Sequence, residues 1–299
     1  MKAVPRNKVI FTYSSRHKPV EHVKPNETFM MMTEDAFGGQ IRVEKDTVEG
    51  LDWSKVDGAT GPVFVETAKP GDTLVVEILG VKTESKGVIV TVPKHGILGE
   101  TPFGPVTRRI KLKRGFVQFE KDVKLKIRPM IGTIGVAPKE GEIATGSLGK
   151  HGGNMDVKDV IAGAKLYLPV FVEGALFAAG DLHAVQADGE SCVSAVEVAG
   201  EVTLRFRLIR GRQPEWPVLE TEESYSILAC GDTLDQAAKY AAEASVKTLM
   251  REHAWSFEKA YMFSSLAADL RVSQVVDPKK GVRAVISKDF VTLKSLLTA

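Results

Sequence analysis

The sequence predicts a mainly β protein with a helical hairpin added near its C-terminus, and two observations lead to this prediction. Between Lys8 and Leu208, short β-rich runs such as "DTLVVEILGV" and "LYLPVFV" alternate with Gly, Pro and Asp, a spacing typical of β-sandwiches and barrels. From residue 232 onward, apolar residues recur at helical spacing instead. We therefore expect a β-rich region over residues 8–210 and a helical hairpin over 232–272 packed on it. Residues 1–299 then form a single unit, although two intimately fused halves would fit the same pattern.

The clearest predicted strand is "VTLRFRLI", residues 202–209. Val202, Leu204 and Phe206 fall on one face and the residues between them on the other, which is the alternation of a half-buried antiparallel strand. The preceding run "SCVSAVEV" ends in a glycine-containing turn. We therefore expect residues 191–198 and 202–209 to form a hairpin.

The C-terminal part of the sequence predicts two helix N-termini. Thr233 and Gln236 have the spacing of a capping box, and the alanine-rich run that follows places apolar residues along one stripe. A second helix is expected after the Ser256 cap, with a stripe formed by Ala260, Phe263, Leu266 and Leu270. The many alanines favour close packing of the helices against their neighbours.

The overall charge points away from large polyanionic partners. Lys and Arg number 40 against 38 Asp and Glu, a formal net charge of +2, so nothing in the balance indicates nucleic acid or an anionic membrane. The N-terminal residues contain no apolar run of signal-peptide length, and no segment approaches a membrane span, so we expect a cytoplasmic protein. Cys192 and Cys230 are not in CxxC spacing, which makes a disulfide framework an unfavourable interpretation.

The stretch "GDLHAVQADGE", residues 180–190, concentrates groups that hold metals or move protons. Asp181 and His183 are two residues apart, so an extended backbone places both on one face. Gln186, Asp188 and Glu190 have the opposite parity, so all five converge only if a bulge or turn lies near Val185. The alternative interpretation is a surface turn at Asp188 with solvated carboxylates and a structural His183.

Further candidate residues lie upstream. His151, Asn154 and Asp156 fall in the glycine-rich stretch "KHGGNMDV", where glycines allow the backbone to approach a ligand closely. Oxygen and imidazole groups from two segments suit a divalent cation such as zinc, calcium or manganese. Asp35 beside a Gly-Gly turn and Glu66 before "TAKPGD" are weaker candidates, because such residues are usually solvated.

These motifs resemble the acetamidase/formamidase family over residues 9–286. "GDLHAVQADGE", "HGGNMDV", "TEDAFGGQI", "GDTLVVEI", "IGTIGVAP" and "LRVSQVVDPKKGVRA" occur in the order expected of that family. The resemblance implies a jelly-roll-like β-sandwich with appended helices that hydrolyses short aliphatic amides to carboxylate and ammonia at a divalent metal site. It further implies that Asp181 and His183 bind the metal, with Asp156 or Asn154 near it, and that Glu190 lies close to the substrate.

The resulting hypothesis assigns a role to each candidate residue. The metal, zinc or alternatively calcium, is assigned to Asp181, His183, Asp156 and Asn154; catalysis to Glu190 and Asp188; and substrate binding to His151, Gln186, Asp35 and Glu66. Amide hydrolysis needs an activated water, a stabilised oxyanion and an acid for the leaving amine. The rival hypothesis is a non-enzymatic sandwich with a structural calcium ion, which gives no special need for the imidazole of His183. The mixed apolar and charged run "DLRVSQVVDPKKGVRA" after an alanine-rich helix favours a homodimer or larger homo-oligomer.

Overall fold

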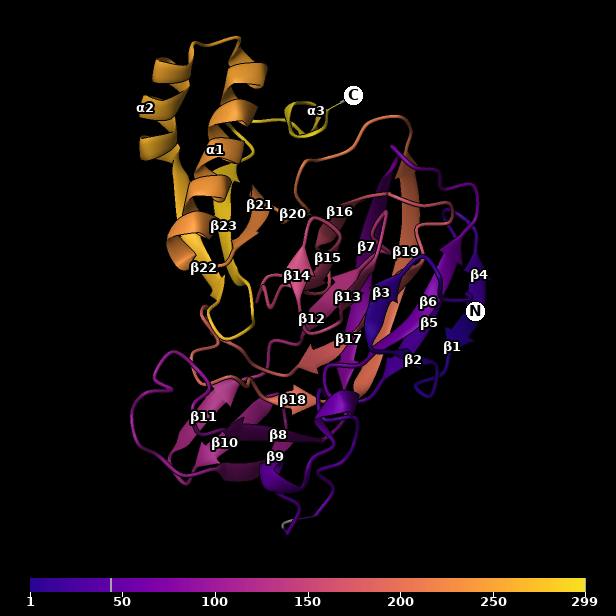
Figure 1. Ribbon diagram of the computed structural model, residues 1–299, viewed down its shortest axis with the longest axis vertical. Coiled ribbons are helices and arrows are strands. Elements are labelled where there is room, and N and C mark those ends of the chain that lie inside the picture. The colour runs from indigo at the N-terminus through magenta and orange to yellow at the C-terminus, as the bar shows by residue number, and fades with distance from the viewer. Residues whose placement is uncertain (44, 299) are drawn as a thin grey trace.

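Two large β-sheets face each other, and helices cover one end of the first sheet (Figure 1). The computed structural model describes residues 1–43 and 45–298. Over this part of the chain, the first sheet has nine strands in the order β1-β5-β19-β7-β16-β20-β21-β23-β22. The second has twelve, nine of them in the order β11-β10-β9-β8-β18-β17-β12-β15-β14, with β6 joining β17 to β2 and β4; β13 and β3 form a separate pair.

The strands are Lys2–Val4 (β1), Val9–Ile10 (β2), Thr12–Ser14 (β3), Glu21–Val23 (β4), Thr28–Thr33 (β5), Ala59–Val65 (β6), Thr73–Thr83 (β7), Lys86–Thr91 (β8), Val106–Lys113 (β9), Phe116–Glu120 (β10), Val123–Lys126 (β11), Met130–Gly135 (β12), Glu142–Ala144 (β13), Leu148–Gly149 (β14), Gly152–Asn154 (β15), Lys165–Pro169 (β16), Phe177–His183 (β17), Glu197–Val198 (β18), Gly200–Ile209 (β19), Val218–Glu220 (β20), Ser224–Gly231 (β21), Ala268–Gln274 (β22) and Lys280–Ser287 (β23). The helices are Leu234–His253 (α1), Phe257–Ala267 (α2) and Leu293–Leu296 (α3), with 3-10 turns at Val48–Gly50 (η1) and Trp53–Lys55 (η2). No helix of the described residues is both long and apolar enough to span a bilayer.

The core lies between the two large sheets. The predicted strand at residues 202–209 is confirmed as part of β19, with Val202, Leu204 and Phe206 fully buried. The Phe206 ring contacts Phe29 of the first sheet at 4.8 Å and Phe177 of the second at 4.9 Å between ring centroids. Since burying one such side chain contributes about 1.5–3 kcal/mol, the alternating apolar faces hold the sandwich together. The predicted mainly β class with appended helices is confirmed.

The predicted hairpin of residues 191–198 with 202–209 is wrong. Only Glu197–Val198 is a strand in the first run, and it pairs with β17 and β8 in the second sheet, whereas β19 pairs with β5 and β7 in the first. The chain therefore changes sheets at Ala199. Alternation indicates that a segment is extended, but it does not determine its partner, because both sheets offer the same backbone hydrogen bonds.

The predicted helix caps are confirmed. Thr233 accepts the Gln236 amide at 3.2 Å, and Ser256 accepts the Lys259 amide at 3.4 Å. Ala237 and Ala241 of α1 are fully buried in one cluster with Val282 and Ala284, so the alanines do allow close packing, against β21 and β23.

The predicted extent of the second helix is wrong. α2 ends at Ala267, and residues 268–274 form β22, which pairs with β23 along the edge of the first sheet. Leu266 is 85% exposed and Leu270 49% exposed, so neither belongs to a buried helical stripe. A short run of apolar residues fits helical and strand periods alike, and here the ladder with β23 decides.

The second sheet positions the candidate site. β17 lies between β12 and β6 or β18, and its C-terminal end lies beside the turn that joins β22 to β23 (Figure 1). A hydrogen bond of 3.0 Å from Asn154, in β15, to Asp277, in that turn, fixes the contact between the two segments. Groups that are far apart in the sequence therefore meet at the end of β17.

Candidate functional site

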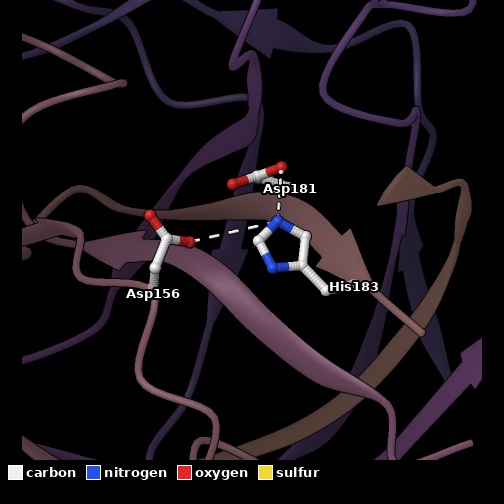
Figure 2. A group of neighbouring side chains, drawn as sticks. All are labelled: Asp156, Asp181 and His183. Carbon is white, nitrogen blue, oxygen red and sulfur yellow. Dashed lines mark hydrogen bonds and ion pairs between the residues drawn. The ribbon is translucent and has the colours of Figure 1, made fainter. Parts of the chain in front are cut away.

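The imidazole of His183, the last residue of β17, is the centre of a buried acidic cluster. Its Nε2 atom lies 3.2 Å from Asp181 Oδ1, 3.0 Å from Glu197 Oε2 and 3.9 Å from Asp156 Oδ1. Figure 2 shows Asp156 and Asp181 directed at this same ring nitrogen. The four side chains are at most 3% exposed, so the carboxylates converge on one nitrogen out of contact with bulk water.

Gln186 fixes the orientation of this ring. Its Nε2 donates to the carbonyl of Asp156 at 2.6 Å, which leaves Oε1 to accept from His183 Nδ1 at 2.8 Å. Because Oε1 can only accept, Nδ1 carries the hydrogen. In the neutral imidazole the lone pair of Nε2 therefore points at the carboxylates, an arrangement that requires a proton or a cation between them.

The backbone at the site takes conformations that bring the carboxylates inward. Asp156, Asp181 and Glu190 have positive φ angles of 45°, 53° and 44°, a region that non-glycine residues rarely adopt and that clusters at functional sites. Gly132 in β12 leaves the space they need, since a Cβ there would lie 2.5 Å from both Asp156 Oδ1 and Asp181 Oδ2. The turn after His183 brings Gln186 and Glu190 back toward β17, whereas Asp188 of the same predicted set does not join them.

Several buried oxygens of the cluster lack a hydrogen-bond donor. Asp156 Oδ1, Asn154 Oδ1 and Glu197 Oε2 are inaccessible to solvent, and among the described residues no donor apart from the imidazole of His183 is directed at them. Asn154 directs its Nδ2 to Asp156 Oδ2 at 2.7 Å and to Asp277, so its oxygen stays unpaired. Buried polar atoms normally have partners, and unpaired acceptors beside an imidazole fit a missing cation.

Burial and mutual repulsion shift most of the carboxylates toward their neutral forms. Burial, reinforced by neighbouring carboxylates, raises the pKa values of Asp57, Asp156, Glu190 and Asp277 well above their ordinary values. Burial is also the main cause that raises the pKa of Glu197 to about 7. These five groups and Asp181 cannot all ionise together, so the six carboxyl groups strongly attract a cation.

Asp181 and His183 behave as the ionised pair within this cluster. Burial alone would raise the pKa of Asp181, but the charge and hydrogen bond of His183 outweigh it and lower that pKa. Burial likewise opposes the charge on His183, yet the charges of Glu197 and Asp181 raise the His183 pKa well above its ordinary value. The imidazolium then supplies to these carboxylates the positive charge that a bound metal ion would supply.

A small cavity of about 80 Å³ leads to the cluster. Its acidic lining residues include Asp57, Glu190, Asp277 and Asp181, beside His183. Its apolar lining includes Phe37, Val90 and Val92, which belong to one buried cluster, and Val193, which packs against that cluster. The rings of Trp53 and His95, which also line the cavity, stack at 6.4 Å.

The donor set suits a divalent metal ion. The ligand atoms of Asp156, Asp181 and His183 lie within 4.8 Å of one another, and so do those of His183, Glu190 and Glu197. Imidazole with carboxylates is the set that zinc accepts, whereas a set of oxygens alone would favour calcium.

Comparisons with known proteins show the family of this chain. Residues 13–146 and 140–289 match the profile of the Acetamidase/Formamidase family. The chain belongs to this family. The crystal structure of an acetamidase from Bacillus halodurans is 37% identical, has a TM-score of 0.95, and covers 98% of this chain and 99% of its own.

Two other similar proteins extend the comparison. A recombinant predicted acetamidase/formamidase from Thermoanaerobacter tengcongensis is 40% identical with a TM-score of 0.94, over 99% of this chain and 97% of that chain. The formamidase of Methylophilus methylotrophus is 26% identical over 286 residues, 73% of this chain and 70% of that protein. The chain spans 61% to 70% of the length of the curated relatives that it matches.

Six of the residues singled out from the sequence gather at the site of this family member. They are Asn154, Asp156, Asp181, His183, Gln186 and Glu190. Gln186, which the sequence assigns to the substrate, contacts His183 and the Asp156 backbone instead. Its position is that of a residue that orients the imidazole.

Asp188 lies outside the cluster. Its carboxylate pairs with Arg283 at 2.8 Å and with Lys158 at 2.8 Å, and the Arg283 side chain is fully buried. Asp159 contacts the same guanidinium at 3.3 Å. These contacts explain why a carboxylate next to the site turns away from it: the buried Arg283 requires acidic partners.

His151, Asp35 and Glu66 also lie elsewhere. The His151 ring is 2% exposed, stacks edge-on against Tyr13 at 5.0 Å, and borders a different cavity beside α1. Asp35 accepts the Gly39 amide at 3.0 Å in a turn. Glu66 follows the last residue of β6. The first residue of β6, Ala59, is the one that pairs with Gly180 of β17, next to Asp181, so Glu66 lies at the other end of the strand.

Sequence reasoning missed three acidic residues of the site. Glu197 lies inside the run "SAVEVAG", whose other residues are apolar or small. A single charged residue in such a run indicates a buried carboxylate, and this signal could have identified Glu197. Asp57 precedes β6 and Asp277 lies in the β22–β23 turn, and both are partly exposed along the cavity wall. An acidic residue before glycine or proline resembles an ordinary turn, so their sequence context carries no such signal.

Proposed function

We propose that the protein is an amidase that hydrolyses short aliphatic amides, such as formamide and acetamide, to a carboxylate and ammonia with the aid of a divalent metal ion. One observation carries the proposal: in a chain of the acetamidase/formamidase family, the oriented Nε2 of His183 faces three buried carboxylates beside a small cavity. Free acceptor oxygens at the same place support the metal.

The metal is assigned to His183, Asp181 and Asp156, with Glu197 and Asn154 offering further oxygens. The unpaired Asp156 Oδ1, Asn154 Oδ1 and Glu197 Oε2 atoms support this ligand set. Bound there, a divalent ion supplies Lewis acidity, which lowers the pKa of water and polarises an amide carbonyl. Zinc accepts an imidazole ligand, and Gln186 orients the imidazole of His183. Zinc is therefore proposed ahead of calcium.

Glu190 is the proposed proton carrier. It lies in the cavity wall, and burial raises its pKa well above the ordinary value. In its ionised form it takes a proton from the attacking water. It then gives that proton to the amide nitrogen as the C–N bond breaks, so ammonia leaves and the acyl group becomes a carboxylic acid.

The cavity favours small substrates. A volume of about 80 Å³ leaves little room beyond a short acyl group, and the valine side chains of the lining suit a hydrogen or methyl substituent. The amide group is placed beside the metal ligands and Glu190, which line the same cavity.

The test combines metal analysis with an activity assay. Protein purified without chelator is expected to contain about one equivalent of divalent metal and to release ammonia from formamide and acetamide; chelator-treated protein should lose both, and zinc should restore them. His183→Ala is expected to lower metal content and turnover together, whereas the exposed His22→Ala serves as a matched control. Retention of metal and full activity by His183→Ala would reject the proposed site. A metal-loaded protein that hydrolyses no short amide would instead favour the structural-calcium hypothesis.

Assembly and location stay as the sequence predicts them. We propose a cytoplasmic protein that forms a homo-oligomer through its C-terminal region.

A further inference from the structure

The outer face of α2 is unusually apolar. Tyr261 is 56% exposed, Met262 65% and Leu266 85%, and Phe257 at the start of the helix is 53% exposed. The opposite face, with Ala260 and Ser264, is the one that packs inward. A surface helix normally presents charged and polar residues outward, so this face is arranged for contact with another molecule.

The patch continues onto β22, which follows α2 directly. Leu270 is 49% exposed and lies opposite Ala284 in the ladder with β23. Ala284 packs against α1, so Leu270 is on the helix-covered face of the sheet, next to α2. Helix and strand together therefore form one apolar surface, hereafter the α2–β22 patch: Phe257, Tyr261, Met262, Leu266 and Leu270.

β22 is also an open edge of its sheet. Among the described strands it pairs with β23 alone, and the isolated bridge from Gly189 reaches only Gln274 at its far end. The outer backbone groups from Ala268 to Val272 thus have no strand neighbour. An exposed edge of this kind pairs readily with another strand unless the protein blocks it.

The sequence of this edge is complementary to itself. Residues 268–272 read Ala-Asp-Leu-Arg-Val. In an antiparallel pair centred on Leu270, Asp269 of one copy faces Arg271 of the other, twice by symmetry, and Leu270 faces Leu270. Asp269 and Arg271 have exposed side chains, 67% and 46%, and their charged groups lie 2.7 Å apart within one chain.

We propose that a second copy of this chain covers the α2–β22 patch in a twofold dimer. The two β22 strands pair antiparallel about Leu270 and join the first sheets of both copies, while the two α2 helices pack through their apolar outer faces. A twofold interface must use one self-complementary patch on both partners, and this patch combines matching charge, an open edge and apolar side chains.

The area is in the range that a dimer needs. The exposed parts of the five patch side chains amount to on the order of 500 Å² of apolar surface. A standard interface buries roughly 800 Å² on each partner, including a polar rim. The backbone edge of β22 and the Asp269 and Arg271 side chains supply that rim.

The first experiment measures mass in solution by sedimentation and light scattering at micromolar concentration. The full chain is expected at twice its 32.5 kDa. Leu266→Asp should weaken dimerisation by at least about a hundredfold, because each interface loses two buried leucines. Leu266 is so exposed that its replacement should leave folding and amidase activity intact. The matched control is Val123→Asp, which alters an apolar residue, 48% exposed, on the edge strand β11 of the other sheet.

A charge swap tests the register. Asp269→Arg or Arg271→Asp alone places like charges opposite each other twice and should raise the dimer dissociation constant roughly tenfold or more. The double variant Asp269→Arg/Arg271→Asp restores opposite charges across the twofold axis and should restore the dimer. A monomeric wild-type chain, a Leu266→Asp variant with unchanged assembly, or a double variant no tighter than the single ones would each overturn the proposal. None of these results depends on amide hydrolysis.

Discussion

Replacing Gln186 with leucine tests whether the imidazole of His183 must be held in one tautomer. The change keeps most of the side-chain volume but removes the acceptor of the 2.8 Å hydrogen bond from His183 and the 2.6 Å donor to the Asp156 carbonyl. His183 can then rotate or place its proton on Nε2, the nitrogen that faces the carboxylates. We therefore expect Gln186→Leu to weaken metal binding.

The size of the effect follows from the contacts that are lost. Removing a partner that orients a metal-binding histidine typically lowers metal affinity or activity 10- to 100-fold, about 1.4–2.7 kcal/mol. The protein also loses stability of about 1–2 kcal/mol, since two polar groups lose partners but Gln186 is half-buried and water replaces part of the bonding.

The assay is a competition titration of zinc into chelator-stripped protein, followed by kcat at saturating zinc. If orientation is the role of Gln186, excess zinc should return kcat of Gln186→Leu to within a few-fold of wild type. Gln186→Glu keeps an acceptor for Nδ1 and is expected to bind zinc more tightly than Gln186→Leu. The reasoning is refuted if Gln186→Leu binds zinc as tightly as wild type, or if Gln186→Glu is equally weakened.

Three further predictions concern the carboxylates, a buried histidine and the mouth of the cavity. Glu190→Gln should lower kcat for acetamide by about two to four orders of magnitude with unchanged metal content. Asp188→Asn should leave kcat unchanged and lower the unfolding free energy by about 1.5–3 kcal/mol, since Arg283 loses one of the two carboxylates that it contacts among the described residues. Equal kcat losses in both variants would contradict these roles. Burial lowers the pKa of His151 to about 4, so the stability that its neutral form contributes is present above the unfolded pKa near 6.5 and is lost as the pH falls toward 4, by up to about 3 kcal/mol. Denaturant titrations across this pH range should show a shallower loss of unfolding free energy in His151→Asn than in wild type. Parallel curves for the two proteins would contradict this prediction. Trp53→Ala should open the stack with His95 and raise kcat/KM for longer amides such as butyramide relative to acetamide by roughly tenfold; an unchanged ratio would show that the mouth does not select for size.

The sequence by itself determined the features that depend on neighbours along the chain. Alternation at Val202–Ile209, the caps at Thr233 and Ser256, and the two-residue spacing of Asp181 and His183 all express contacts within a few residues. For such contacts the backbone geometry of strands and helix ends fixes which side chains meet.

Only the tertiary structure decided which distant groups complete the site and which leave it. Asn154 and Asp277 are 123 positions apart and meet through the order of strands and the turn between β22 and β23. Asp188, two residues from Glu190, turns instead to the fully buried Arg283, whose charge must be neutralised inside the protein. Leu270 likewise lies in a strand and not in the predicted helix, because residues 268–274 pair with β23. Strand partners and buried charges are chosen by competition among all segments of the fold, and local sequence patterns do not encode the outcome of that competition.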